Sequence, residues 1–183
     1  MMSILKNMNL PNKLTCLRMV LIPVFLLFFY APFVAGRYLS LVVFIIASLT
    51  DTADGYIARK YDLVTDFGKF MDPLADKLLV CSALICLVDT QELAAWVVII
   101  IIAREFIISG FRLVAADNGI VIAASWWGKI KTIVQMALII IMLLNISSWA
   151  VLETILTVAA VILTIVSLID YIWKNRSVLG SAA

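Results

Sequence analysis

Four aspartates fall into two closely spaced pairs whose spacing suits the binding of metal ions. Asp51 and Asp54 are three residues apart, and Asp72 and Asp76 are four residues apart. On a helix of about 100° per residue, both separations place the members of a pair on one face. Two such faces that meet across the turn at 60–66 gather four carboxylates, which repel each other unless they bind protons or cations.

The chemistry expected of this cluster is phosphate transfer on divalent metal ions. Mg²⁺ prefers oxygen ligands and usually binds a few carboxylates together with substrate phosphates. Two metal ions about 4 Å apart can hold the attacking and leaving oxygens of a phosphate displacement. Gly55 and Ala58 continue the face of the first pair and leave room for a phosphate-bearing ligand near the backbone. Arg59 adds a guanidinium group, whose planar fork suits phosphate.

The alternative is that the aspartates are solvated loop charges or helix caps. Asp51 and Asp54 come at the C-terminal end of their predicted helix, where the helix dipole disfavours anions. Capping therefore does not explain this pair. Asp72 precedes Pro73, and proline is common at the first position of a helix, so capping stays open for Asp72.

Membrane-spanning helices are the elements that must position these residues. The chain has 183 residues, of which 64% are hydrophobic, whereas soluble domains are about half apolar. We therefore predict an all-α integral membrane protein with a single membrane domain, residues 1–183. Residues 1–13 suit a short N-terminal interfacial helix, with a frayed tail as the alternative. Six transmembrane helices are predicted at roughly 14–34, 38–60, 66–89, 92–116, 125–147 and 150–174.

Three uncharged runs are too short to cross a membrane by themselves. The runs at 38–50, 78–88 and 93–103 contain 13, 11 and 11 residues, whereas a span needs roughly 20. These helices can span only if their charged flanks also lie at membrane depth. Charge that faces lipid is costly, so we expect these side chains to line a polar cavity.

The placement of lysine and arginine predicts the orientation. With six spans, thirteen of these residues fall on one face of the membrane, and the other face has only Arg37. Cytoplasmic loops carry the excess of lysine and arginine. We therefore expect both termini and the opening of the cavity on the cytoplasmic side. The chain has no histidine, which excludes catalysis by a histidine base.

The aspartate pattern resembles the signature of the CDP-alcohol phosphatidyltransferases. The match covers eight defined positions, namely Asp51, Asp54, Gly55, Ala58, Arg59, Gly68, Asp72 and Asp76. The resemblance implies that Asp51, Asp54 and Asp72 hold two divalent cations, Mg²⁺ or Mn²⁺, which bind the pyrophosphate of a CDP-lipid. It implies that Asp76 mainly accepts the proton of the attacking hydroxyl, that the small residues and Arg59 contact the CDP moiety, and that the protein is a homodimer. Spacing alone leaves open whether Asp76 is a base, a metal ligand or both.

A second group of charged residues suits an acceptor that itself carries phosphate. Arg104 and Arg112 are offset by about 80° on a helix, so both can line one broad wall. Lys129 and Lys131 are about 200° apart on a helix, so we do not expect both to face the cavity. One of them can extend to the headgroups instead. The alternative is that all four are anchors on the cytoplasmic side.

Three flanking stretches resemble bacterial phosphatidylglycerophosphate synthases. They are residues 10–18, 103–109 and 128–132, and the similarity extends over about residues 9–173. The implied acceptor is sn-glycerol 3-phosphate, the implied donor is CDP-diacylglycerol, and the implied location is the inner membrane of a bacterium. Asn12, Thr15 and Arg18 are expected near the nucleotide or the acceptor, with Thr15 at the CDP-lipid and Arg18 at the acceptor. Their alternative is simply entry into the first helix.

Other functions remain open from the sequence. Within the family, the acceptor could be phosphatidylglycerol, serine or an inositol phosphate. A cation transporter explains the carboxylates but not Gly55, Ala58, Arg59 and Gly68, and an inactive assembly subunit does not explain the complete motif. Membrane lipid is an expected partner, and nucleic acid is not.

Overall fold

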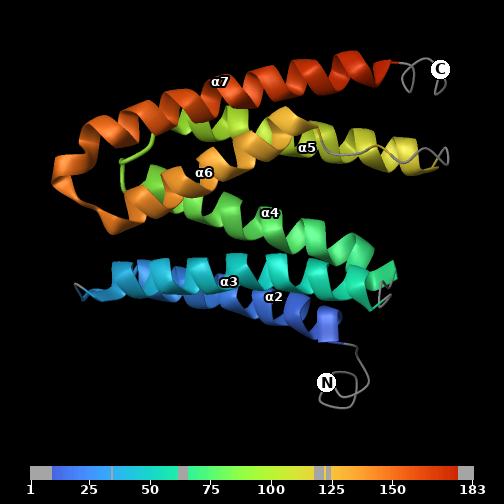
Figure 1. Ribbon diagram of the computed structural model, residues 1–183. Coiled ribbons are helices and arrows are strands. Elements are labelled where there is room, and N and C mark those ends of the chain that lie inside the picture. Colours follow the sequence, from blue (N-terminus) through green and yellow to red (C-terminus); the bar gives the residue numbers. More distant parts are fainter. Residues whose placement is uncertain (1–9, 34, 62–65, 118–121, 123–124, 177–183) are drawn as a thin grey trace. The chain divides into compact units, whose positions relative to one another are not determined.

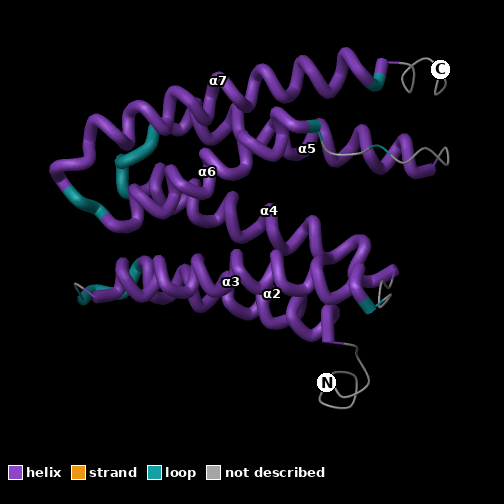
Figure 2. The backbone as a smooth tube through the Cα atoms, in the orientation of Figure 1, coloured by secondary structure: helices purple, strands orange, loops and turns teal. Residues whose placement is uncertain are grey.

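Six long α-helices account for most of the residues that the structure describes. The computed structural model describes residues 10–33, 35–61, 66–117, 122 and 125–176, and within these ranges it describes only the backbone of residues 10, 11, 51–59, 66–70, 72, 73 and 117. The helices are α2 (Leu10–Phe29), α3 (Ala35–Lys60), α4 (Asp66–Asp89), α5 (Ala95–Asp117), α6 (Trp126–Leu144) and α7 (Ala150–Lys174), with a short 3₁₀ helix η1 (Ser147–Trp149) before α7. The described residues contain no strand (Figure 2).

Three helical segments are long and apolar enough to cross a membrane. They are Asn12–Phe29, Trp126–Leu144 and Ser147–Lys174, and Ala35–Thr50 is a shorter apolar helix. Large apolar side chains are exposed along α7, from Val151 to Ile169. Such a surface is stable when lipid surrounds it. The expected all-α membrane protein is therefore confirmed.

The described helices belong to two compact units, residues 1–86 and residues 87–183, which we call the N-terminal and C-terminal units. Each unit is described by itself. The expectation of one membrane domain stays a prediction. Residues 1–9 of the expected interfacial helix lie outside the described residues, and residues 10–13 belong to α2.

In the N-terminal unit, α2 packs along α3 (Figure 1). The rings of Phe25 and Phe44, one from each helix, are buried with their centroids 6.2 Å apart. Near the connection between the helices, a Cβ atom at Gly36 would lie 2.6 Å from the carbonyl oxygen of Phe28. Glycine is therefore required there for the close approach of the two backbones.

In the C-terminal unit, α7 packs against both α5 and α6. Local sequence defines the ends of α6: Ser125 caps its start by accepting a hydrogen bond from the Gly128 backbone N–H at 3.1 Å. Asn145 ends the helix in the left-handed conformation, with φ of 50°. Between these ends, buried apolar residues such as Leu138 and Leu143 face the unit's interior. This arrangement fixes the rotation of α6 and thereby selects which of its polar side chains are buried.

Candidate functional site

The four aspartates lie at the ends of α3 and α4 that border the 60–66 turn. Asp51 and Asp54 belong to the last three turns of α3, and Asp72 and Asp76 to the first half of α4. The backbone thus places both pairs on helices, as their spacing predicts. Asp76 has a half-buried side chain. The side chains of the other three aspartates, and those of Gly55, Ala58, Arg59 and Gly68, lie outside the described residues, so their roles stay predictions.

The donor set of this segment fits divalent metal ions by its chemistry. On the helix faces that carry the two aspartate pairs, the titratable groups are carboxylates. Carboxylates are the oxygen ligands that Mg²⁺ and Mn²⁺ prefer. The helical backbone of α3 and α4 supports the one-face spacing of each pair. Metal binding itself stays a prediction.

A buried cluster of charges joins α5 to α6 in the C-terminal unit. The Glu105 carboxylate oxygen Oε1 accepts a hydrogen bond from Arg104 NH1 at 3.1 Å and from Lys131 Nζ at 2.5 Å. Lys131 is 1% exposed and Arg104 is 8% exposed. Charges removed from water in this way are stable only when they are paired and hydrogen-bonded. One carboxylate therefore brings two cationic side chains together inside a helical unit.

Helix α7 completes this cluster through a serine. Arg104 Nε donates a hydrogen bond to Ser167 Oγ at 3.1 Å, and Ser167 Oγ donates to the carbonyl oxygen of Thr164 at 3.0 Å. Both hydroxyl residues are fully buried. The guanidinium group of Arg104 is thus held on two sides, by Ser167 and by the adjacent Glu105.

Arg112 lies two turns beyond Arg104 on α5 but in a more exposed place. Its guanidinium carbon is 5.9 Å from the centroid of the Tyr171 ring, a cation–π distance. The Tyr171 ring also meets Phe111 edge to face, with centroids 6.1 Å apart. Arg112 therefore lies over a buried aromatic ring, whereas Arg104 lies in the charge cluster.

The two lysines of α6 differ sharply in burial. Lys129 is exposed, and Lys131 is buried against Glu105. This agrees with the offset of about 200° between the two lysines on a helix, from which we do not expect both side chains to face the cavity. Among the residues expected near the nucleotide or the acceptor, Asn12, Thr15 and Arg18 are all buried in the N-terminal unit. Their burial does not decide between a ligand contact and a packing role.

Several polar residues of the C-terminal unit were not predicted from the sequence. Gln135 and Tyr171 are 3% and 2% exposed, and the Gln135 Oε1 and Tyr171 hydroxyl oxygens have no hydrogen-bond partner in the described part of the chain. Buried polar atoms usually have partners, so these two suit a polar ligand. For α7 the sequence does contain a signal of buried polar residues. Thr164, Ser167 and Tyr171 lie at helical spacing on one face of a mostly apolar helix.

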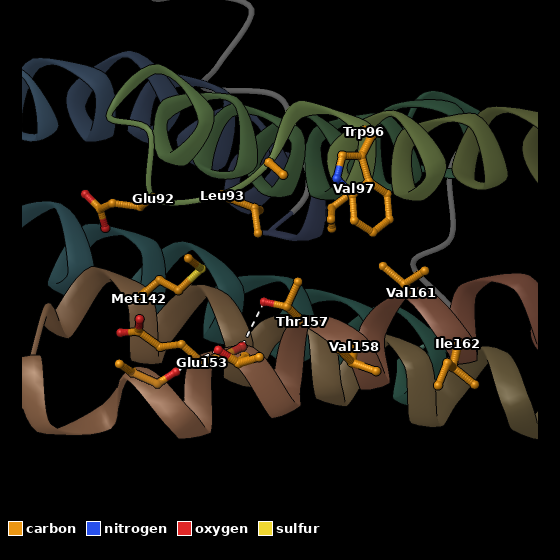
Figure 3. Close-up of a pocket in the computed structure, with 13 residues that line it drawn as sticks. Glu92, Leu93, Trp96, Val97, Met142, Glu153, Thr157, Val158, Val161 and Ile162 are labelled. Atoms are coloured by element: carbon orange, nitrogen blue, oxygen red, sulfur yellow. Dashed lines mark hydrogen bonds between the residues drawn. The ribbon is translucent and has the colours of Figure 1, made fainter.

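A separate cavity of about 520 Å³ lies near the other end of α7, within the same unit. Figure 3 shows Glu92 and Glu153 toward one end of the drawn group and Trp96 and Ile162 toward the other. Its lining residues are Glu92, Leu93, Ala94, Trp96, Val97, Met142, Ala150, Glu153, Thr154, Thr157, Val158, Val161 and Ile162. None of the predicted site residues whose side chains the structure describes lines this cavity, and it is not part of the candidate site.

Comparison with known proteins shows the family that the chain belongs to. A sequence profile described as CDP-alcohol phosphatidyltransferase matches residues 8–166. The chain is 51% identical over 149 residues to the CDP-diacylglycerol–glycerol-3-phosphate 3-phosphatidyltransferase of Bacillus subtilis, covering 75% of this chain and 77% of the relative. It is 44% identical over 137 residues to the protein of the same name from Rickettsia bellii, covering 75% and 76%. It is 42% identical over 168 residues to a probable phosphatidylglycerophosphate synthase of Mycobacterium tuberculosis, covering 90% and 80%.

Proposed function

The chain belongs to the CDP-alcohol phosphatidyltransferase family, and we propose that it transfers the phosphatidyl group of CDP-diacylglycerol to sn-glycerol 3-phosphate. The acceptor hydroxyl oxygen forms a bond to the phosphorus that carries diacylglycerol, and the bond from that phosphorus to the oxygen of CMP breaks. The products are phosphatidylglycerophosphate and CMP. The observation that favours a phosphorylated acceptor is the buried cluster in which Arg104 and Lys131 both pair with Glu105.

In this proposal the aspartates handle the donor. Asp51, Asp54 and Asp72 would hold two divalent ions, Mg²⁺ or Mn²⁺, with Asp76 as a further ligand. Ions bound there would supply positive charge that offsets the pyrophosphate and the charge that develops on the leaving CMP. Asp76 accepts the proton of the attacking hydroxyl, because a carboxylate at that position is the predicted base of the motif. Its half-buried side chain on α4 is compatible with this role.

The remaining motif residues bind the CDP moiety. The small residues Gly55, Ala58 and Gly68 leave the helix surface open to the nucleotide, and Arg59 pairs with its phosphates. Thr15 contributes a buried hydroxyl from α2, and Arg18, one turn further along α2, contributes positive charge for the acceptor.

The cations of the C-terminal unit bind the phosphate group of the acceptor. Arg104 and Lys131 supply donors from two different helices, and Arg112 supplies a further guanidinium group over Tyr171. A phosphate dianion suits such a set, because charge-assisted hydrogen bonds from several donors are strong in a buried site. The Gln135 and Tyr171 side-chain oxygens, which have no hydrogen-bond partner among the described residues, offer further positions for the polar acceptor.

The placement in the membrane is also part of the proposal. We infer six spans, both termini and the active site on the cytoplasmic side, and the inner membrane of a bacterium as the location. The one-sided distribution of lysine and arginine supports this orientation. We further propose a homodimer surrounded by membrane lipid, as the family resemblance implies.

The test is release of CMP from CDP-diacylglycerol by the purified protein in detergent, with sn-glycerol 3-phosphate, serine, phosphatidylglycerol or an inositol phosphate as the acceptor. We expect release with glycerol 3-phosphate, its loss on chelation of divalent ions, and its return on addition of Mg²⁺ or Mn²⁺. Release with serine alone would overturn the acceptor. Absence of release with every acceptor in the presence of metal would overturn the enzyme assignment and favour a transporter.

A further inference from the structure

We propose that Glu105 is a positioning residue, whose carboxylate holds Arg104 and Lys131 together as a preformed site for the phosphate group of the acceptor. The inference rests on the proposed function and adds a role for an anionic residue that the motif does not include. Glu105 does not itself contact the phosphate in this account. It acts through the two cations.

The hydrogen bonds show how one carboxylate connects two helices. Glu105 and Arg104 are neighbours on α5, and Lys131 projects from α6, 26 residues further along the chain. Both cations donate to the same oxygen, Oε1, at 3.1 and 2.5 Å. Atoms that share one acceptor oxygen are held at a short and defined separation. The Glu105 carboxylate thus sets the distance between the two cationic groups.

The charge balance explains why an anion belongs in this site. Arg104 and Lys131 carry two positive charges and Glu105 one negative charge, so the three side chains sum to one positive charge. The negative charge of a carboxylate repels phosphate, so a site that served only to attract phosphate would contain no carboxylate. Without it, however, Lys131, which has only 1% of its surface exposed, would lose its ion pair with Glu105. Removal of one partner from a buried pair is strongly destabilising, so Glu105 keeps both cations inside before the acceptor arrives.

The surroundings of Arg104 limit its movement in the same way. Ser167 accepts from Arg104 Nε at 3.1 Å, on the side of α7. Gly128 lies next to its other terminal nitrogen, because a Cβ atom at residue 128 would be 3.0 Å from Arg104 NH2. The guanidinium group is therefore bordered by Glu105, Ser167 and Gly128. A site held in this way loses little side-chain entropy when a ligand binds.

The first experiment compares steady-state kinetics of Glu105→Gln with those of the wild-type protein. Gln keeps the shape and an acceptor oxygen but removes the charge. We expect the KM for sn-glycerol 3-phosphate to rise by at least about tenfold, while the KM for CDP-diacylglycerol changes by less than about twofold. Glu105→Asp keeps the charge and should lie between the two. Glu153→Gln, the same substitution in the first turn of α7, is the control and should leave both KM values unchanged.

A second variant separates positioning from simple stability. Glu105→Gln should lower the midpoint of thermal unfolding, because it removes the ion pair between Glu105 and the buried Lys131, and Glu105→Gln combined with Lys131→Met should restore the midpoint. The KM of Glu105→Gln for glycerol 3-phosphate should stay raised when it is measured well below the unfolding midpoint of the variant, where the protein is folded. If Glu105→Gln left this KM unchanged or lowered it under these conditions, the positioning role would be refuted. A wild-type protein inactive with glycerol 3-phosphate would instead refute the proposed function.

Discussion

Each unit of the chain contains one cluster of charged residues, acidic in the N-terminal unit and mainly cationic in the C-terminal unit, and the charges of the two clusters are neutralised by different means. In the N-terminal unit, the sequence groups four aspartates on two helix ends, and in our proposal their neutralisation comes from metal ions that arrive with the donor. In the C-terminal unit, Glu105 already neutralises part of the charge of Arg104 and Lys131. The difference follows from the ligands. Metal ions supply the missing charge at an acidic site, whereas a buried cationic site must be stable before its anionic substrate binds.

Among the variants that test the two clusters, Asp76→Asn in the acidic cluster should have the largest effect. An amide cannot accept the proton of the attacking hydroxyl, so we expect kcat to fall by about 10²- to 10⁴-fold. Binding of CDP-diacylglycerol in the presence of Mg²⁺ should persist, as measured by equilibrium binding to the purified variant. Lost binding would show instead that Asp76 is chiefly a metal ligand.

Lys131→Met should damage only the acceptor side. The variant removes a buried cation and leaves the Glu105 carboxylate close to the phosphate position, so the KM for glycerol 3-phosphate should rise by about 10- to 100-fold. The matched comparison is Lys129→Met, two residues away on α6 but exposed. Initial-rate measurements should show a much smaller effect at Lys129. Equal effects at the two lysines would contradict the site described here.

Arg112→Ala should have an intermediate effect. Its guanidinium group is exposed and lies over the Tyr171 ring, outside the Glu105 cluster. We expect the KM for the acceptor to rise by about 5- to 10-fold, because an exposed cation contributes less than a buried one. The KM for CDP-diacylglycerol should change less, and the opposite order would remove Arg112 from the acceptor site.

The smallest effect is expected for Gly128→Ala. A Cβ atom there would lie 3.0 Å from Arg104 NH2 and would displace the guanidinium group by a few tenths of an ångström. We expect a rise of about 2- to 5-fold in the KM for glycerol 3-phosphate. Gly110→Ala is the control, because beyond its own stretch of helix no described atom lies within 4 Å of a Cβ atom at that position. A similar change in both variants would indicate a general effect of the added methyl group on the helices.

Sequence reasoning was most successful for the helices, for physical reasons. Long apolar runs demand lipid-facing helices, and the spacing of Asp51 and Asp54 is informative because three residues on a helix return to one face. The spacing of Lys129 and Lys131 likewise predicts that they do not both face the cavity. Which of them faces inward could not be predicted, because it depends on the rotation of α6 that packing against α7 selects.

The cationic cluster shows what sequence could not supply. Glu105 stands next to Arg104 in the sequence, but its pairing with Lys131 requires α5 and α6 to meet at one level. Ser167 is 63 residues from Arg104, and its hydrogen bond depends on the packing of α7. Contacts of this kind are tertiary. The polar residues of α7 can be recognised in the sequence by their helical spacing, but the sequence does not show which residues of other helices they contact.

The division of labour between the two units is tested most directly by isothermal titration of CDP with Mg²⁺, and separately of sn-glycerol 3-phosphate, into the wild-type protein and two double variants. These are Asp51→Asn with Asp54→Asn, and Arg104→Met with Lys131→Met. The account predicts that the first variant loses binding of CDP and keeps that of glycerol 3-phosphate, and that the second does the reverse. Loss of both ligands in both variants, with unfolding midpoints unchanged, would contradict it.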